Sequence, residues 1–190
     1  RIHYITSPRC QKCGKQLADD GAIYCMDCQT KQHYFTRGYA LYDYQSMKKS
    51  IYRYKYGGRC EYAKFYAEDL YQCFREMPQL WDADAIIPVP LHKQRRQQRG
   101  YNQAELIAKE LGKLTQIPVY QSLVVRVRKT VPQKELDAIS RQNNLKKAFN
   151  ITADVVKLKK TIIIDDIYTT GSTIDAISKE LKEHGVGEVY

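Results

Sequence analysis

The sequence has no long hydrophobic run. No stretch approaches the roughly 18 consecutive apolar residues that a transmembrane helix needs, and residues 1–8 have no apolar core of the kind found in a secretion signal. We therefore expect a cytoplasmic protein without a transmembrane segment. Hydrophobic residues at 43% and charged residues at 27% are an ordinary globular balance, which excludes extensive disorder.

Acidic side chains are scarce in the middle of the chain. Residues 85–160 carry 16 Lys and Arg against 5 Asp and Glu, whereas residues 161–190 carry 2 against 6. The net charge of +10 is therefore concentrated in one basic segment that an acidic segment follows. Such a segment favours polyanionic partners, namely phosphorylated ligands, nucleic acid or an anionic membrane surface. Solubility alone is the other explanation.

Four of the six cysteines form two C-x-x-C pairs separated by eleven residues: Cys10, Cys13, Cys25 and Cys28. In a reducing cytosol these pairs predict a structural zinc site, because four thiolates surround one tetrahedral ion. Two disulfides or a redox pair are the alternative, although redox C-x-x-C motifs usually occur singly. We predict a zinc ribbon over residues 1–36, and we interpret Cys60 and Cys73 as core thiols.

Strand and helix patterns alternate after the ribbon. We expect strands at residues 38–44, 85–89, 121–127 and 161–164, and helices at 46–56, 60–77, 102–114 and 172–184. We also expect a long loop at 132–144 that enters a helix reaching about Phe149. This order predicts an α/β domain over residues 37–190, with a mostly parallel sheet and flanking helices. A new strand begins at Tyr190, so we expect the C-terminal strand to be truncated.

Residues 161–173 are the most informative segment, because an apolar strand is followed by two carboxylates, a hydroxyl-rich loop and a helix. Ligands of parallel sheets bind beyond the carboxyl ends of the strands, and a helix N-terminus favours phosphate. Two carboxylates at this place suit the vicinal hydroxyls of a sugar whose 5′-phosphate lies in the loop. The candidate residues are Asp165, Asp166, Thr169, Thr170, Gly171, Ser172 and Thr173. An ordinary strand-turn-helix with capping hydroxyls is the alternative.

This segment resembles the phosphoribosyl pyrophosphate (PRPP) signature of type I phosphoribosyltransferases. Nearly the whole chain resembles one branch of that group, the ComF family of late competence proteins. The matching parts are the four-cysteine ribbon and residues 55–59, 87–92, 99–103, 132–133, 140–141 and 164–173. The resemblance implies a zinc ribbon joined to a type I phosphoribosyltransferase-like domain.

The same resemblance implies a function in natural transformation, in which single-stranded DNA enters the cytoplasm with the help of a helicase-like ATPase. A protein of this kind associates peripherally with the inner face of the membrane through the uptake machinery. The resemblance makes Asp165 and Asp166 the ribose contacts and residues 169–173 the 5′-phosphate loop. Residues 91–100 then hold the diphosphate, and residues 126–141 form a mobile hood over the site.

The basic segment contains candidate diphosphate or DNA contacts: Lys93, Arg95, Arg96 and Arg99. Magnesium would share the charge of PRPP with these residues. The basic excess is larger than one small substrate requires, and the sixteen tyrosines include candidates for stacking on unpaired bases. We therefore expect single-stranded DNA as a partner, and we expect the ribbon to be a docking module that adds little to the sugar-phosphate site.

Two alternatives to an accessory factor for DNA uptake remain open at this point. The first is an active phosphoribosyltransferase, a glycosyltransferase-class enzyme, of unknown acceptor. The second is an adaptor whose nucleotide site is vestigial, which the intact carboxylates and hydroxyl loop disfavour. The sequence contains no recognisable base-recognition segment, so it does not decide whether the protein is an enzyme.

Overall fold

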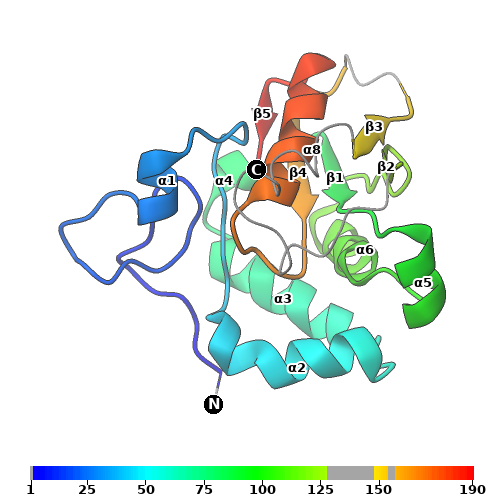
Figure 1. The fold of residues 1–190 in the computed structure, drawn as a ribbon, viewed down its shortest axis with the longest axis horizontal. Coiled ribbons are helices and arrows are strands. Elements are labelled where there is room, and N and C mark those ends of the chain that lie inside the picture. Colours follow the sequence, from blue (N-terminus) through cyan, green and yellow to red (C-terminus); the bar gives the residue numbers. More distant parts are fainter. Residues whose placement is uncertain (1, 128–147, 154–156) are drawn as a thin grey trace.

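The structure is a computed structural model that describes residues 2–127, 148–153 and 157–190 (Figure 1). Its helices include α1 (Met26–Thr30), α2 (Tyr44–Tyr56), α3 (Tyr62–Phe74), α4 (Pro78–Trp81), α5 (Lys93–Arg99), α6 (Gln103–Thr115) and α8 (Ser172–Glu183). Its strands include β1 (Ala85–Pro88), β2 (Val124–Arg126), β3 (Phe149–Ile151), β4 (Lys160–Ile164) and β5 (Glu188–Val189). The orders β1-α5-α6-β2 and β4-α8-β5 follow the predicted alternation of strands and helices, whereas α1 to α4 all precede β1.

In the described part of the chain, β4 is the central strand of a three-stranded parallel sheet with the order β1-β4-β5. β1 pairs with β4 from Ala85 opposite Thr161 to Pro88 opposite Ile164. Every residue of β1 is buried, and β4 is buried from Thr161 onward, as expected for parallel strands covered on both faces. The parallel sheet is therefore confirmed, and the carboxyl ends of β1 and β4 lie at the same edge.

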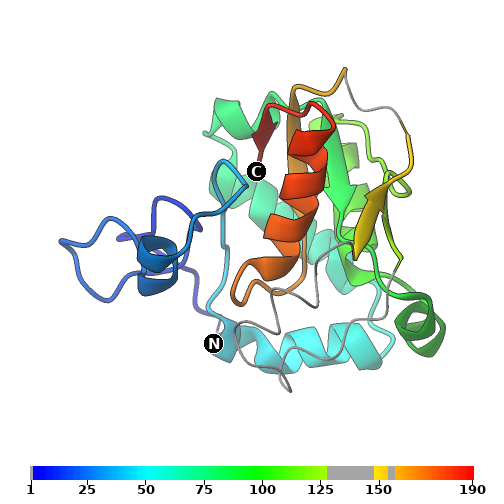
Figure 2. The same ribbon diagram turned by 45° about the horizontal axis from the view of Figure 1, so that its top comes forward.

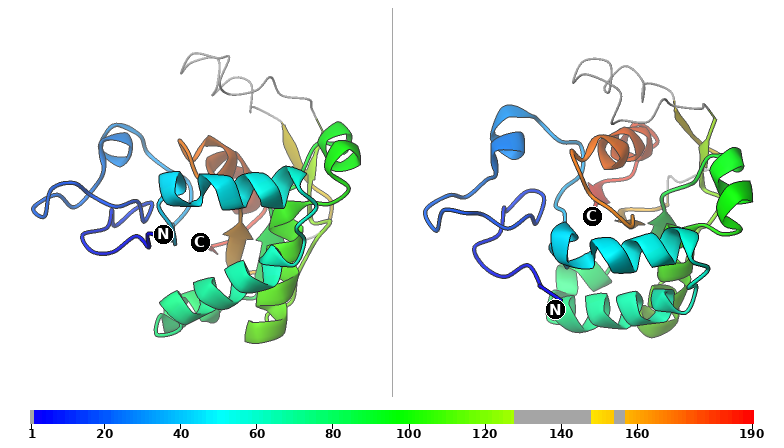
Figure 3. Two further views of the ribbon diagram at one scale, coloured as in Figure 1. Left: turned by 90° about the horizontal axis from the view of Figure 1, so that it is seen from below. Right: turned by 60° about the horizontal axis from the view of Figure 1, so that its bottom comes forward.

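Helices cover both faces of this sheet. α6 contacts β1 and β4 from one side, and α3 packs against α6, while α8 lies on the opposite face (Figures 2 and 3). The core between these layers contains fully buried Ile86, Ile87, Leu111, Ile177 and Leu181. Within the described ranges, no helix combines the length and the apolar character that crossing a membrane requires.

α2 lies along the rim of the domain, next to the loop that follows β4 (Figure 3). The helix begins at Tyr44, because the Asp43 carboxylate accepts a hydrogen bond of 3.0 Å from the Ser46 N–H and caps it. Its inner face buries Met47 and Tyr54. The Tyr54 hydroxyl donates to the Gln103 carbonyl over 2.8 Å, which fixes α2 to the start of α6.

Several local predictions are wrong. Residues 38–43 form no strand in the described structure; Tyr42 makes an isolated bridge with Tyr4. Cys60 and Cys73 are exposed rather than core thiols, since Cys60 precedes α3 and Cys73 lies at the edge of its buried stripe. The strand expected at 121–127 exists as β2, but it pairs antiparallel with β3. The loop predicted at 132–144 lies outside the described residues. The helix expected to reach about Phe149 is wrong at that residue, because Phe149 begins β3 and pairs with β2.

Candidate functional site

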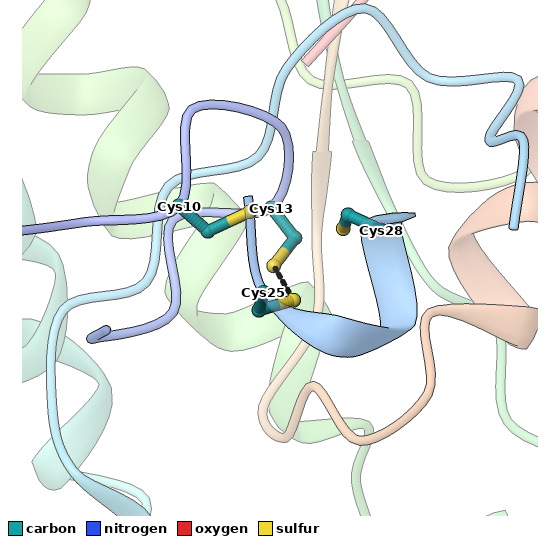
Figure 4. A group of neighbouring side chains, drawn as sticks. All are labelled: Cys10, Cys13, Cys25 and Cys28. Atoms are coloured by element: carbon teal, nitrogen blue, oxygen red, sulfur yellow. Dashed lines mark hydrogen bonds between the residues drawn. The ribbon is translucent and has the colours of Figure 1, made fainter. Parts of the chain in front are cut away.

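The four predicted metal ligands come together from two segments (Figure 4). Cys10 and Cys13 belong to an N-terminal turn, and Cys25 and Cys28 lie at the start of α1. All four Sγ atoms lie within 4.8 Å of one another, and Cys13 Sγ is 3.7 Å from Cys25 Sγ. Tetrahedral zinc with Zn–S bonds of about 2.3 Å places its sulfurs about 3.8 Å apart. The cluster therefore has the geometry of a structural zinc site.

The backbone around the first pair explains how this cluster forms. Gly14 has φ of 74° and donates its N–H to the Cys10 carbonyl over 2.9 Å. A Cβ atom on Gly14 would lie 2.7 Å from the Gly38 carbonyl oxygen, so no side chain fits here. Burial, together with the neighbouring thiol of Cys10, raises the pKa of Cys13 to about 12. The Cys13 thiol therefore keeps its proton in the absence of metal, and zinc would displace this proton when it binds the sulfur as a thiolate.

The carboxylate pair lies directly beyond the carboxyl end of β4. The Asp166 N–H donates to Asp165 Oδ1 over 2.8 Å. Lys55, near the end of α2, places its Nζ atom 2.8 Å from Asp166 Oδ2, and the two side chains are only 14% and 12% exposed. Burial and the Asp166 carboxylate raise the pKa of Asp165 to about 7, although Lys55 and Arg126 oppose this. The two neighbouring carboxylates therefore repel each other in a partly buried place. A bound cation, or hydroxyl groups that donate to the carboxylates, would reduce this repulsion.

The hydroxyl loop connects this pair with α8. Gly171, with φ of 75°, is the N-cap of α8 and offers no side chain to its first N–H groups. The hydroxyls of Thr170 and Ser172 are 2.8 Å apart. A Cβ atom on Gly171 would lie 2.4 Å from the Tyr168 hydroxyl, so this ring closes over the turn. The structure therefore brings the predicted residues into one turn with the carboxylates at its start.

The ribbon packs directly on this turn. The Tyr168 ring makes an edge contact with Phe35, with centroids 6.4 Å apart, and Lys15 Nζ lies 5.4 Å from the Tyr168 centroid. In the first turn of α8, Asp175 accepts from the Tyr34 N–H over 2.9 Å and contacts His33 Nδ1 at 2.5 Å. These contacts differ from the expectation that the ribbon adds little to the site, because the ribbon supports both Tyr168 and the start of α8.

The predicted diphosphate segment is a helix rather than a loop. α5 begins after His92, whose Nδ1 accepts from the Gln94 N–H at 3.4 Å. Its four basic residues differ in their surroundings: Lys93 and Arg95 are exposed, Arg96 lies 3.2 Å from Glu105, and Arg99 donates to Gln103 and Tyr56 over 3.0 Å each.

Arg126 of β2 is close enough to α5 and to the carboxylates for their charges to act on it. Burial and the nearby Arg95 lower the pKa of Arg126, whereas Asp165 opposes this. The guanidinium itself lies 5.5 Å from the centre of the Phe149 ring. The rest of the predicted hood falls mostly outside the described residues.

A cavity of about 460 Å³ adjoins Asp165 and Asp166, with largely apolar walls that include Tyr66 and Ile163. Tyr190, the last residue of the chain, belongs to the same wall. The two carboxylates are therefore polar groups at the edge of a largely apolar cavity.

Known proteins align with nearly the whole chain, although no family model matches it. The chain is 34% identical to competence protein F of Haemophilus influenzae over an alignment of 188 positions, which covers 96% of this chain and 82% of that protein. The chain belongs to the competence protein F family. It is also 32% identical to DNA utilization protein YhgH of Salmonella typhimurium over 184 residues, covering 95% of the chain and 80% of that protein. Competence protein ComFC of Bacillus subtilis is 26% identical over an alignment of 199 positions, gaps included, which covers 97% of this chain and 76% of that protein.

In this member of the competence protein F family, the structure adds site residues that the sequence did not predict. Lys55 belongs to a segment that resembles the family, but its ion pair with Asp166 is a contact between distant parts of the chain. The contacts of Tyr168 and of Asp175 with the ribbon are equally non-local. The signals for Lys55 were its place in the matching segment of residues 55–59 and its position before Gly57 and Gly58, at the end of a predicted helix.

Proposed function

We propose that the chain is an accessory protein for the uptake of single-stranded DNA in natural transformation, and that its phosphosugar site takes PRPP with magnesium. The observation that carries this proposal is the arrangement of Asp165 and Asp166 at the end of β4, directly before the turn that opens α8. The names of the relatives, competence proteins and a DNA utilization protein, support the role in DNA handling.

The residues present fit a phosphosugar. The ribose hydroxyls would donate to Asp165 and Asp166, and the 5′-phosphate would accept from the hydroxyls and first N–H groups of residues 169–173. Lys93 and Arg95, exposed on α5, are cations available either for the diphosphate or for the phosphates of a DNA strand. Carboxylate oxygens are ligands that magnesium prefers, and the raised pKa of Asp165 reflects charge that a cation would offset. Magnesium would neutralise the diphosphate when bound.

The remaining parts of the proposal concern the protein partner and the location in the cell. We place the protein beside a helicase-like ATPase at the inner, cytoplasmic face of the membrane, with the zinc ribbon structural in role. A pull-down of the ATPase with the full chain and with the Cys13→Ser variant examines this association.

An active phosphoribosyltransferase of unknown acceptor is the second candidate. Both carboxylates are present, and a pair of this kind stabilises positive charge that develops at a sugar carbon. Release of pyrophosphate from PRPP, in the presence of nucleobases or amines as acceptors, would favour turnover over binding.

The DNA part of the proposal predicts binding that weakens steeply with salt. If about five cations contact phosphates of a single strand, the slope of log affinity against log salt is roughly −3.5, which is about a hundredfold loss between about 50 and 200 mM salt. Fluorescence anisotropy with labelled oligothymidylate measures this. Affinity that does not change with salt would refute an electrostatic contact with the phosphate backbone.

A further inference from the structure

Two neighbouring helices of the structure present cations without any carboxylate. α2 contains Lys48, Lys49, Arg53 and Lys55, and α5 contains Lys93, Arg95, Arg96 and Arg99; neither helix contains Asp or Glu. Lys55 is paired with Asp166, and Arg96 with Glu105. Within the described part of the chain, the exposed Lys48, Lys49, Arg53, Lys93 and Arg95 form no ion pair. This surface therefore has positive charge that is available to a polyanion.

Exposed tyrosine rings lie among these cations. Tyr52 and Tyr56 are 64% and 61% exposed, with ring centroids 5.1 Å apart. They are four residues apart and lie on one face of α2, about 6 Å from each other along the helix axis. The buried face of the same helix is made by Met47 and Tyr54, so the two exposed rings do not contribute to the core.

Arg99 connects the two helices at Tyr56. Its guanidinium lies 4.9 Å from the centre of the Tyr56 ring and donates to the Tyr56 hydroxyl over 3.0 Å. A second donation to Gln103 Oε1, also 3.0 Å, holds the guanidinium at the start of α6. The Tyr56 ring is therefore positioned by α5 and α6, and one of its faces carries a cation.

We propose that α2 and α5 together form the surface that binds single-stranded DNA, which rests on the function proposed above. Tyr52 and Tyr56 stack on unpaired bases, and the exposed cations of the two helices contact the phosphates. Stacking between bases and aromatic rings is available to single strands, because a duplex buries the faces of its bases. This assigns the tyrosine contacts to α2, which lies outside the basic segment of residues 85–160.

An anionic membrane is the other polyanion with this charge preference. Helices that lie on membranes insert an apolar face with large aliphatic or aromatic residues. The apolar face of α2 instead turns into the protein through Met47 and Tyr54. The large exposed hydrophobic residues of α2 are tyrosines: Tyr44, Tyr52 and Tyr56. A single strand is therefore the better occupant of this surface.

The test uses the full chain and two labelled strands, oligothymidylate and an abasic strand of equal length and charge. We expect Tyr52→Ala and Tyr56→Ala each to weaken binding of oligothymidylate by roughly fivefold or more, and to leave binding of the abasic strand unchanged. Arg53→Ala should weaken binding of both strands. The matched controls are Tyr52→Phe, which keeps the ring, and Tyr120→Ala, which removes another exposed tyrosine; both should bind as wild type does.

Three outcomes overturn the proposal. A wild-type chain that binds neither strand refutes the proposed DNA function and this surface with it. If the two alanine variants bind oligothymidylate as tightly as wild type does, the proposed surface is refuted, but the proposed DNA function is not. Loss of binding to phosphatidylglycerol vesicles in the tyrosine variants, with DNA binding intact, assigns the surface to a membrane instead. Circular dichroism checks that each variant is folded.

Discussion

Replacing Asp165 with asparagine is expected to stabilise the fold above about pH 7 and to weaken binding of PRPP with magnesium. Burial and the Asp166 carboxylate raise the pKa of Asp165 to about 7 in the folded protein, whereas a carboxyl in an unfolded chain titrates near about 3.9. Between these values the folded state holds more protons than the unfolded state, so the stability falls as pH rises. Asparagine carries no charge, and its Oδ1 still accepts from the Asp166 N–H.

The ligand loses a charged partner in the same variant. A hydrogen bond to a charged group contributes about 1.5–3 kcal/mol, so Asp165→Asn should weaken PRPP binding by at least roughly tenfold. Thermal midpoints at several pH values measure the stability, and calorimetry with PRPP and magnesium measures the affinity. Asp20→Asn, which changes an exposed carboxylate of the ribbon, is the matched control. A variant that is less stable at every pH and still binds PRPP would contradict the assignment of Asp165.

Removal of zinc is expected to disorder the ribbon and to loosen the turn that opens α8. Small zinc domains are commonly unfolded without their metal, because the metal contributes on the order of 10 kcal/mol or more to folding. Lys15 and Phe35 support the Tyr168 ring from the ribbon, and Tyr34 donates to Asp175. Loss of the ribbon would therefore remove contacts from the hydroxyl loop as well.

Metal analysis and hydrogen exchange measure these effects together. Wild type should contain one zinc ion per chain, and Cys13→Ser should contain less. Chelation should speed amide exchange at residues 168–176 in addition to the ribbon. Cys60→Ser and Cys73→Ser change exposed cysteines outside the cluster and should keep the zinc. Wild type without zinc refutes the metal site, and faster exchange confined to residues 2–36 refutes the coupling.

The sequence predicted the parts of the site that are local in the chain. β4, the carboxylates, the hydroxyl loop and α8 are consecutive, so one apolar run and one helical stripe were sufficient to place them. The two cysteine pairs were predicted for a similar reason, because the spacing within each pair fixes its turn. Which face of the sheet each helix covers was not predictable from these local patterns.

The features that the sequence did not predict are of two kinds: contacts between distant segments, and elements that have no hydrophobic pattern. Lys55 and Asp166 are more than a hundred residues apart in the sequence, and nothing in either local pattern connects them. α5 has no apolar stripe, and its sequence of Lys, Gln and Arg is as compatible with a loop as with a helix. Residues 38–44 alternate as a strand does, but Gly38 packs against the backbone of Cys13 and not against a neighbouring strand.

A crystal structure of the chain with PRPP and magnesium would show whether the carboxylate pair and the hydroxyl loop bind a phosphosugar. We expect the ribose hydroxyls on Asp165 and Asp166, and the 5′-phosphate within hydrogen-bonding distance of residues 169–173. Lys55 should then leave Asp166 or share it with the ribose. A site that remains empty at saturating PRPP, or a ligand that binds without contact to the carboxylate pair, would contradict the account.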